Sequence, residues 1–243
     1  MFSLLKKEIN SFLGSLIGYI AIVVFLSTLG LFIWVFPGDT NVLDAGYSSL
    51  GSFFYIAPWV FLFLIPAITM KSFADESKTG TLELLITKPL SEFQIVLAKF
   101  LAGVVLVAFS LIPATIYIYS IHQLGNPIGN LDYGATWGSF IGLLFLGATY
   151  VSIGIFASSI TENQIVAFIL AVFLCFFFFV GFDSIAGLGL LDSFDSFMIK
   201  LGINEHYLSI SRGVIDSRDL IYFLSIIIFF LLLTRTKISS RKW

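Results

Sequence analysis

Charge is the scarcest property of this sequence. Only 12% of its 243 residues are Asp, Glu, Lys or Arg, whereas 58% are hydrophobic and the mean hydropathy is +1.00. Soluble domains carry about 25% charged residues, so this composition excludes a water-exposed surface and indicates an integral membrane protein. The formal net charge is −2, which provides no basic footprint for a nucleic acid, and we expect no nucleic-acid partner.

Catalytic motifs are also missing. The sequence has no Gly-Lys dipeptide, so it lacks a P-loop and cannot hydrolyse ATP by that route. Neither histidine lies in an H-E-x-x-H motif, and no G-x-S-x-G elbow is present. The single cysteine, Cys175, lies in an apolar run and is expected to act as a small hydrophobic residue. We therefore expect no catalytic residue, cofactor or metal site in this chain, and a membrane hydrolase, the enzyme alternative, has no motif to support it.

Six apolar runs are long enough to cross a membrane, which requires about 20 mostly apolar residues in a helix. By these boundaries ionisable residues occur only near the ends of the runs, as at Lys99, whereas ion-coupled carriers generally mark their path with such residues in the membrane interior. We predict an all-α membrane protein with one permease-like domain, residues 1–243, and no ion-coupled transport. The predicted spans are residues 17–36, 50–70, 95–120, 137–160, 164–183 and 219–235.

The basic residues predict the orientation of the chain. Ten of the 13 lysines and arginines lie before the first span, between the second and third, or after the sixth, and the connections at 37–49 and 121–136 contain none. Short loops rich in Lys and Arg stay in the cytoplasm. We predict a multi-pass protein of the cytoplasmic (inner) membrane with both termini in the cytoplasm. The ten residues are Lys6, Lys7, Lys71, Lys78, Lys88, Lys99, Arg235, Lys237, Arg241 and Lys242.

Two segments outside the spans are amphipathic. In residues 1–16, apolar side chains recur at helical spacing opposite Lys6 and Lys7. This pattern predicts a helix in the membrane interface with its lysines at the lipid phosphates. The alternative is that these residues begin a long first span. Residues 184–218 are too polar to span and too apolar for a free loop, so we predict short amphipathic pieces on the outer face.

Small residues and helix starts give three further predictions. Gly134, Gly138 and Gly142 are spaced by four, which lets two membrane helices approach closely, either within the chain or across a dimer face. The pair Ser91 with Gln94, and the pair Thr161 with Gln164, both fit the capping box that begins a helix.

The one long hydrophilic stretch of the first half is KSFADESKTGTLELLITKPLSEFQ, residues 71–94. Asp75 and Glu76 are expected to be solvated at the end of the second span, until Gly80 ends that helix in the left-handed conformation. Thr81 is a candidate N-cap for the next helix.

The helix that follows Gly80 is expected to be short. Leu82, Leu85 and Ile86 form an apolar stripe, Glu83 faces away from it, and Pro89 ends the helix. The stripe is suited either to plugging the inner face of the bundle or to docking in the groove of a partner protein.

The stretch FADESKTGTLELLITKPLSEFQIVLAKFLAG, residues 73–103, resembles the signature region of ABC-2-type permeases. The matching elements are the acidic pair Asp75 and Glu76, the Gly-Thr-x-Glu-x-Leu core that begins at Gly80, the Pro-Leu-Ser turn at Pro89 and the lysine Lys99. The chain length, this core and HYLSISRGVIDSRDLIYFLS near the end also resemble the GldF-type permease subunits associated with gliding motility.

The resemblance implies a type V exporter-like fold and a division of labour between subunits. A separate ABC ATPase subunit would bind ATP and Mg²⁺, and residues 81–88 would form a coupling helix in its cleft. A second permease subunit would complete a homodimer or heterodimer among the membrane lipids.

The function implied is export or mechanical work driven by ATP, in gliding motility. A membrane anchor or assembly protein for a cytoplasmic partner, without transport, is the alternative. The ATPase-coupling residues implied are Asp75, Glu76, Gly80, Thr81, Leu82, Glu83, Leu85, Ile86 and Pro89.

Overall fold

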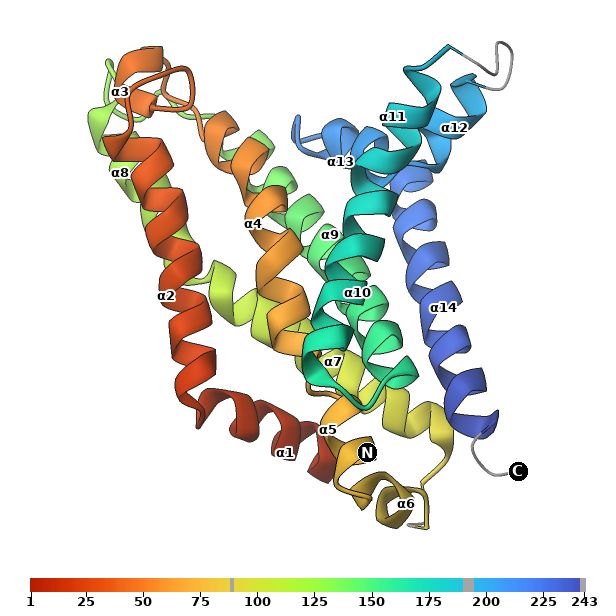
Figure 1. The fold of residues 1–243 in the computed structure, drawn as a ribbon. Helices are drawn as coiled ribbons and strands as arrows, with labels where there is room; N and C mark the ends of the chain where they lie inside the picture. The colour runs from red at the N-terminus through yellow and green to blue at the C-terminus, as the bar shows by residue number, and fades with distance from the viewer. Residues whose placement is uncertain (88–89, 190–194, 241–243) are drawn as a thin grey trace.

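The computed structural model of the chain describes residues 1–87, 90–189 and 195–240, and all regular secondary structure within them is helical (Figure 1). Six helical segments of this part are long and apolar enough to cross a membrane, which confirms the predicted number and the all-α fold. The six segments are Gly18–Val35, Gly51–Lys78, Glu92–Leu124, Tyr133–Ile160, Gln164–Ala186 and Ser217–Ser239.

The helices keep a simple order along the chain. Two π-helical turns, Leu31–Val35 and Phe177–Gly181, extend α2 and α10. The α-helices are α1 (Phe2–Leu13), α2 (Leu16–Gly30), α3 (Val42–Ala45), α4 (Gly51–Thr69), α5 (Ala74–Lys78), α6 (Thr81–Ile86), α7 (Glu92–Leu111), α8 (Ile116–Leu124), α9 (Tyr133–Ile160), α10 (Gln164–Phe176), α11 (Phe182–Ala186), α12 (Asp195–Leu201), α13 (Ile203–Ile210) and α14 (Ser217–Ser239).

The two ends of the helix bundle differ. The N-terminus, α1, α6 and the end of α14 lie at one end, whereas α3, α8 and α11 to α13 lie at the other (Figure 1). We call these the α6 end and the α3 end. The N-terminus and the end of α14 therefore share an end with the segment that joins the second and third spans, as the distribution of basic residues predicts. Arg241, Lys242 and Lys88 of that distribution lie outside the described residues.

Helix α1 is separate from the first span. It ends at Leu13 with Gly14 as its C-cap, and the Ser15 hydroxyl caps α2 by accepting a hydrogen bond of 3.1 Å from the Gly18 amide. α1 then lies across the α6 end of the bundle while α2 runs along it (Figure 1). The break between α1 and α2 makes the alternative of one long first span wrong, and the place of α1 in the membrane interface stays a prediction.

The third span is broken. The helix expected over 95–120 is instead α7, a 3₁₀ turn at Pro113–Thr115, and then α8. Proline has no N–H to donate to the preceding turn, which interrupts the α-helix at that point. The Tyr117 hydroxyl donates to the Leu26 carbonyl at 3.1 Å, so α8 is held against α2 after the break.

Helix α9 is the centre of the fold and packs against α4, α7, α10 and α14. Its residues are mostly buried, and glycines bring its neighbours close. A Cβ placed on Gly147 would lie 2.7 Å from Val107 of α7, and one on Gly154 would lie 2.1 Å from the Thr69 hydroxyl of α4. A larger residue at either position would therefore force Val107 or Thr69 to shift.

The glycine series at the start of α9 packs within the chain. A Cβ on Gly138 would lie 2.6 Å from the Gly213 carbonyl oxygen, and one on Gly142 would lie 2.5 Å from Ile210 of α13. Gly134 is exposed and takes no part in this packing. The intramolecular interpretation therefore holds for Gly138 and Gly142, and the dimer-face interpretation is wrong for them because α13 and the turn after it cover this surface.

The outer segment expected over 184–218 contains the short helices α12 and α13, and its residues 190–194 lie outside the described part. The hydroxyl of Tyr207 on α13 donates to the Phe54 carbonyl of α4 at 2.7 Å. Burial raises the pKa of this hydroxyl, so it remains a protonated donor. His206 lies 2.7 Å from Asp219 and 3.0 Å from the Lys200 carbonyl, which ties α13 to α12 and α14.

Candidate functional site

The turn between α5 and α6 forms the tip of the α6 end. Gly80 has φ of +71°, the left-handed conformation predicted for it. Gly80 also occupies the N-cap position of α6, so the prediction of Thr81 as N-cap is wrong and Thr81 is the first helical residue. The hydroxyl groups of Thr79 and Thr81 lie 2.9 Å apart across the turn, and Thr79 also donates to the Asp75 carbonyl at 2.8 Å.

The apolar stripe of α6 faces the protein interior. Leu82 is 4% exposed and Leu85 is 7% exposed, and both belong to the hydrophobic core. The prediction that these two leucines project toward a partner is therefore wrong, because they plug the inner face of the bundle. The side chain of Ile86 and all of Pro89 lie outside the described part of the structure. The exposed residues of this tip are Lys78, Thr79, Gly80, Thr81, Glu83 and Thr87.

The start of α7 is capped as predicted. The Ser91 hydroxyl accepts from the Gln94 amide at 3.2 Å, and the Gln94 side chain accepts from the Ser91 amide at 3.1 Å. The second predicted capping box is wrong, because Asn163 caps α10 and Gln164 points elsewhere. The Gln164 side chain donates to Asp75 at 2.7 Å and so links α10 to α5.

Lys99 is the residue that sequence reasoning misjudged. In the sequence it was a topology marker and one element of the family resemblance, with no contact predicted for it, yet its side chain is 1% exposed on α7. Its ammonium group donates to the Ser72 carbonyl at 2.6 Å and to Glu8 of α1 at 2.9 Å, and lies 3.0 Å from Glu76 of α5. The Phe73 ring centroid lies 5.0 Å from the same ammonium group. Lys99 therefore joins three helices through a buried ion-pair network.

Lys7 extends this network to the surface. Its ammonium group lies 3.3 Å from Glu76, and its side chain is 62% exposed. Glu76, which was expected to be solvated, is only 12% exposed because two lysines surround it, whereas Asp75 is exposed as predicted. Lys6 is exposed on α1 without a place in the network. Lys7 therefore pairs with the protein while most of its side chain stays exposed, and the place of both lysines at lipid phosphates stays a prediction.

The turn between α4 and α5 is fixed by a second group. The hydroxyl of Ser158 on α9 accepts from the amides of Phe73 at 3.0 Å and Ala74 at 3.1 Å, and donates to the Met70 carbonyl at 2.9 Å. These are backbone groups that the end of α4 and the start of α5 leave without helical partners. Ser158 and Lys99 thus bind the same turn, one from α9 and one from α7.

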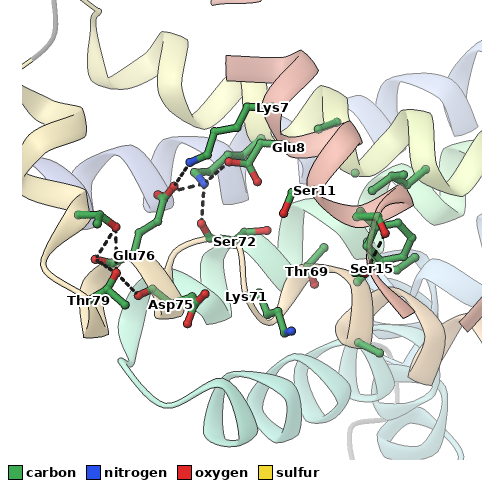
Figure 2. A pocket seen from close by; sticks show the side chains of 18 residues that line it. Lys7, Glu8, Ser11, Ser15, Thr69, Lys71, Ser72, Asp75, Glu76 and Thr79 are labelled. Carbon is green, nitrogen blue, oxygen red and sulfur yellow. Dashed lines mark hydrogen bonds and ion pairs between the residues drawn. The ribbon is translucent and has the colours of Figure 1, made fainter. Parts of the chain in front are cut away.

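A cavity of 350 Å³ opens beside the network, between α1, the end of α4, α5 and α7. Figure 2 shows Lys7, Glu8, Glu76 and Ser72 gathered at one side of it, with Ser11 and Thr69 on the side toward Ser15. Both charged and apolar residues line the cavity. In the described residues no group of three or more His, Cys, Asp and Glu side chains is arranged to hold a metal ion.

The family model described as "ABC-2 family transporter protein" matches residues 39–230, which is more than half of the chain. The chain belongs to this family. The match includes the tip at α6, Glu76 and Lys99, whereas the network partners Lys7 and Glu8 precede it. A comparison with curated proteins gave no match.

Membership of the ABC-2 transporter family defines the general role of the chain. Such proteins are the transmembrane subunits of ABC transporters, and they partner with an ABC ATPase subunit. The six helical segments that are long and apolar enough to cross a membrane agree with that role.

Proposed function

We propose that this ABC-2 permease couples ATP hydrolysis by a separate ATPase subunit to export or mechanical work across the cytoplasmic membrane. The observation that carries the proposal is the tip formed by α5, Gly80 and α6. It joins the second and third spans, lies at the same end as both termini, and presents polar residues outward. ATP and Mg²⁺ would be bound by the ATPase, and a second permease subunit, identical or different, would complete the pathway.

The proposed transmission runs through the tip and the Lys99 network. The burial of Leu82 and Leu85 makes α6 part of the permease body, so a displacement of α6 moves α5 and α7 with it. Lys99 and Lys7 connect those helices to α1 at the membrane surface. The ATPase is therefore expected to contact the exposed residues Thr79, Thr81 and Glu83, and ATP-driven closure would shift the bundle between two states.

The proposal requires the α6 end to face the cytoplasm, and cysteine labelling tests this. We expect Thr79→Cys, at the exposed tip, to be protected from a membrane-impermeant maleimide added to intact cells. Tyr47→Cys, 77% exposed at the α3 end, is expected to be labelled. The native Cys175 is buried and provides a silent background. Labelling of Thr79→Cys with protection of Tyr47→Cys would reverse the orientation and overturn the coupling proposal.

We further propose that the work performed is part of gliding motility. The support is the similarity of residues 206–225 and of the core at Gly80 to gliding-motility permeases. Removal of this chain from its source organism is expected to abolish spreading over a surface, and restoring the chain is expected to return it. Normal spreading without the chain would contradict this assignment and leave the coupling proposal in place.

A further inference from the structure

The cavity beside the Lys99 network has walls of two kinds. Its charged lining consists of three lysines and three carboxylates, and apolar residues of α1, α4 and α7 such as Phe12, Ile68 and Leu106 form the rest. The ligand sites of proteins commonly combine an apolar wall with a few convergent polar groups, in volumes from about 300 Å³ upward. This lining therefore suits an amphiphile with a compact, charged head.

Several charged groups of the lining have capacity for a ligand. Lys71 is exposed and makes no ion pair in the described residues. Lys7 is 62% exposed and contacts a single carboxylate. The Glu76 carboxylate is paired with the ammonium groups of Lys99, 3.0 Å from Oε2, and of Lys7, 3.3 Å from Oε1. A carboxylate has about four lone-pair sites, so it can still accept from one further donor.

The predicted interfacial position of α1 puts the cavity at the level of the bilayer surface, because α1 residues line it. Helix α1 forms one wall, and it runs across the α6 end of the bundle, where the first span begins (Figure 1). Its Phe2 side chain is 85% exposed, as expected for an interfacial helix that inserts apolar residues among lipids. Lipid headgroups of the leaflet at the α6 end therefore have direct access to the cavity mouth.

We infer that this cavity binds the headgroup of a zwitterionic phospholipid that carries a primary ammonium group, the chemistry of phosphatidylethanolamine. The phosphate lies at Lys71 and Lys7, and the ammonium group donates to Glu76 and Asp75. One acyl chain follows the apolar wall into the bilayer. Equal numbers of lysines and carboxylates favour a zwitterion over an anion, because an added net charge would remain uncompensated.

Lipid binding to the purified full chain tests this site. Delipidated protein in detergent is titrated separately with phosphatidylethanolamine, phosphatidylcholine and phosphatidylglycerol, and the bound lipid is counted by native mass spectrometry. We expect one ethanolamine lipid per chain to bind about tenfold more tightly than the other two. Choline has no N–H to donate to the carboxylates, and phosphatidylglycerol brings an unpaired negative charge.

Variants locate the site. Lys71→Gln and Asp75→Asn are expected to weaken ethanolamine-lipid binding about tenfold, whereas Lys6→Gln and Lys78→Gln, which lie outside the lining, leave it unchanged. Ser11→Phe fills the cavity from the exposed face of α1 and is expected to abolish binding even if a charge variant misfolds. Thermal unfolding in the same detergent identifies any misfolded variant.

Three outcomes overturn the inference. Equal binding of phosphatidylglycerol and phosphatidylethanolamine rules out a zwitterion site, and unchanged binding by Lys71→Gln, Asp75→Asn and Ser11→Phe places the lipid elsewhere. Competition by water-soluble glycerophosphoethanolamine at equal concentration shows a site for soluble phosphate esters instead of membrane lipid. No ATPase is present in these measurements, so their failure leaves the coupling proposal untouched.

Discussion

The Lys99→Met variant is expected to lose about 3–5 kcal/mol of folding free energy. Methionine has a similar length but no charge, so Glu8 and Glu76 would remain close together without their shared cation. The Ser72 carbonyl would also lose its donor. For a chain of 243 residues this loss corresponds to a fall in the unfolding temperature on the order of 10 °C, which thermal unfolding in detergent measures.

Two further variants separate the buried network from charge in general. Lys78→Met removes an exposed lysine from the neighbouring helix α5 and is expected to change the unfolding temperature by less than about 2 °C. The triple variant Lys99→Met with Glu8→Gln and Glu76→Gln is expected to regain most of the lost stability, because no uncompensated charge remains. A loss in Lys99→Met no larger than that in Lys78→Met would show that the network contributes nothing to the fold.

Reversing the charge at Glu83 is expected to detach the ATPase without unfolding the permease. Glu83 is exposed and is the charged residue of α6, so Glu83→Arg places an opposite charge at the proposed contact. Like-charge or unpaired contacts across an interface cost several kcal/mol, and we expect at least about a tenfold fall in co-purified ATPase. ATP turnover that depends on the permease is expected to fall in parallel, at an unchanged unfolding temperature.

The matched controls for Glu83→Arg are an exposed acidic residue at the opposite end of the bundle and a buried leucine of α6. Asp39→Arg makes the same charge change at the α3 end, where the side chain is exposed, and is expected to leave the ATPase bound. Leu85→Asp buries a carboxylate in the core and is expected to unfold the tip, so it lowers stability and association together. Full ATPase binding and turnover in Glu83→Arg would contradict the proposed contact surface.

Hydropathy predicts the part of this fold that the bilayer dictates. Six apolar runs of about 20 residues give six helices, because a helix satisfies its backbone hydrogen bonds within a single segment of the membrane. The position of Gly80 was also predictable, since only its left-handed conformation joins α5 to α6 so tightly. The break at Pro113 was visible in the sequence but lay inside a run that hydropathy treats as one span.

The sequence predicts where the candidate site lies along the chain, but it does not predict which residues its side chains contact. An apolar stripe such as that of Leu82 and Leu85 has the same spacing whether it faces a partner or the chain itself, so periodicity cannot choose between them. Lys99 offered a signal for a buried ion pair, because it is a lysine inside an apolar helix. Acids that could pair with it lie in the amphipathic segment 1–16 and in the hydrophilic stretch 71–94. Pairing it with Glu8 requires the path of the chain in space, because 91 residues separate the two.

The turn between α4 and α5 determines how stiff the second span is. Residues 70–73 are not helical, so without support the span would bend there like a compliant joint. Ser158 of α9 and Lys99 of α7 hydrogen-bond to the backbone of this turn, and we expect these bonds to hold α4 and α5 at a fixed angle. Under the proposed coupling, a chain without the Ser158 hydroxyl would still bind its ATPase. The movement of α5 would then bend the chain at residues 70–73 and would not reach α4, so ATP would be hydrolysed without a conformational change at the α3 end.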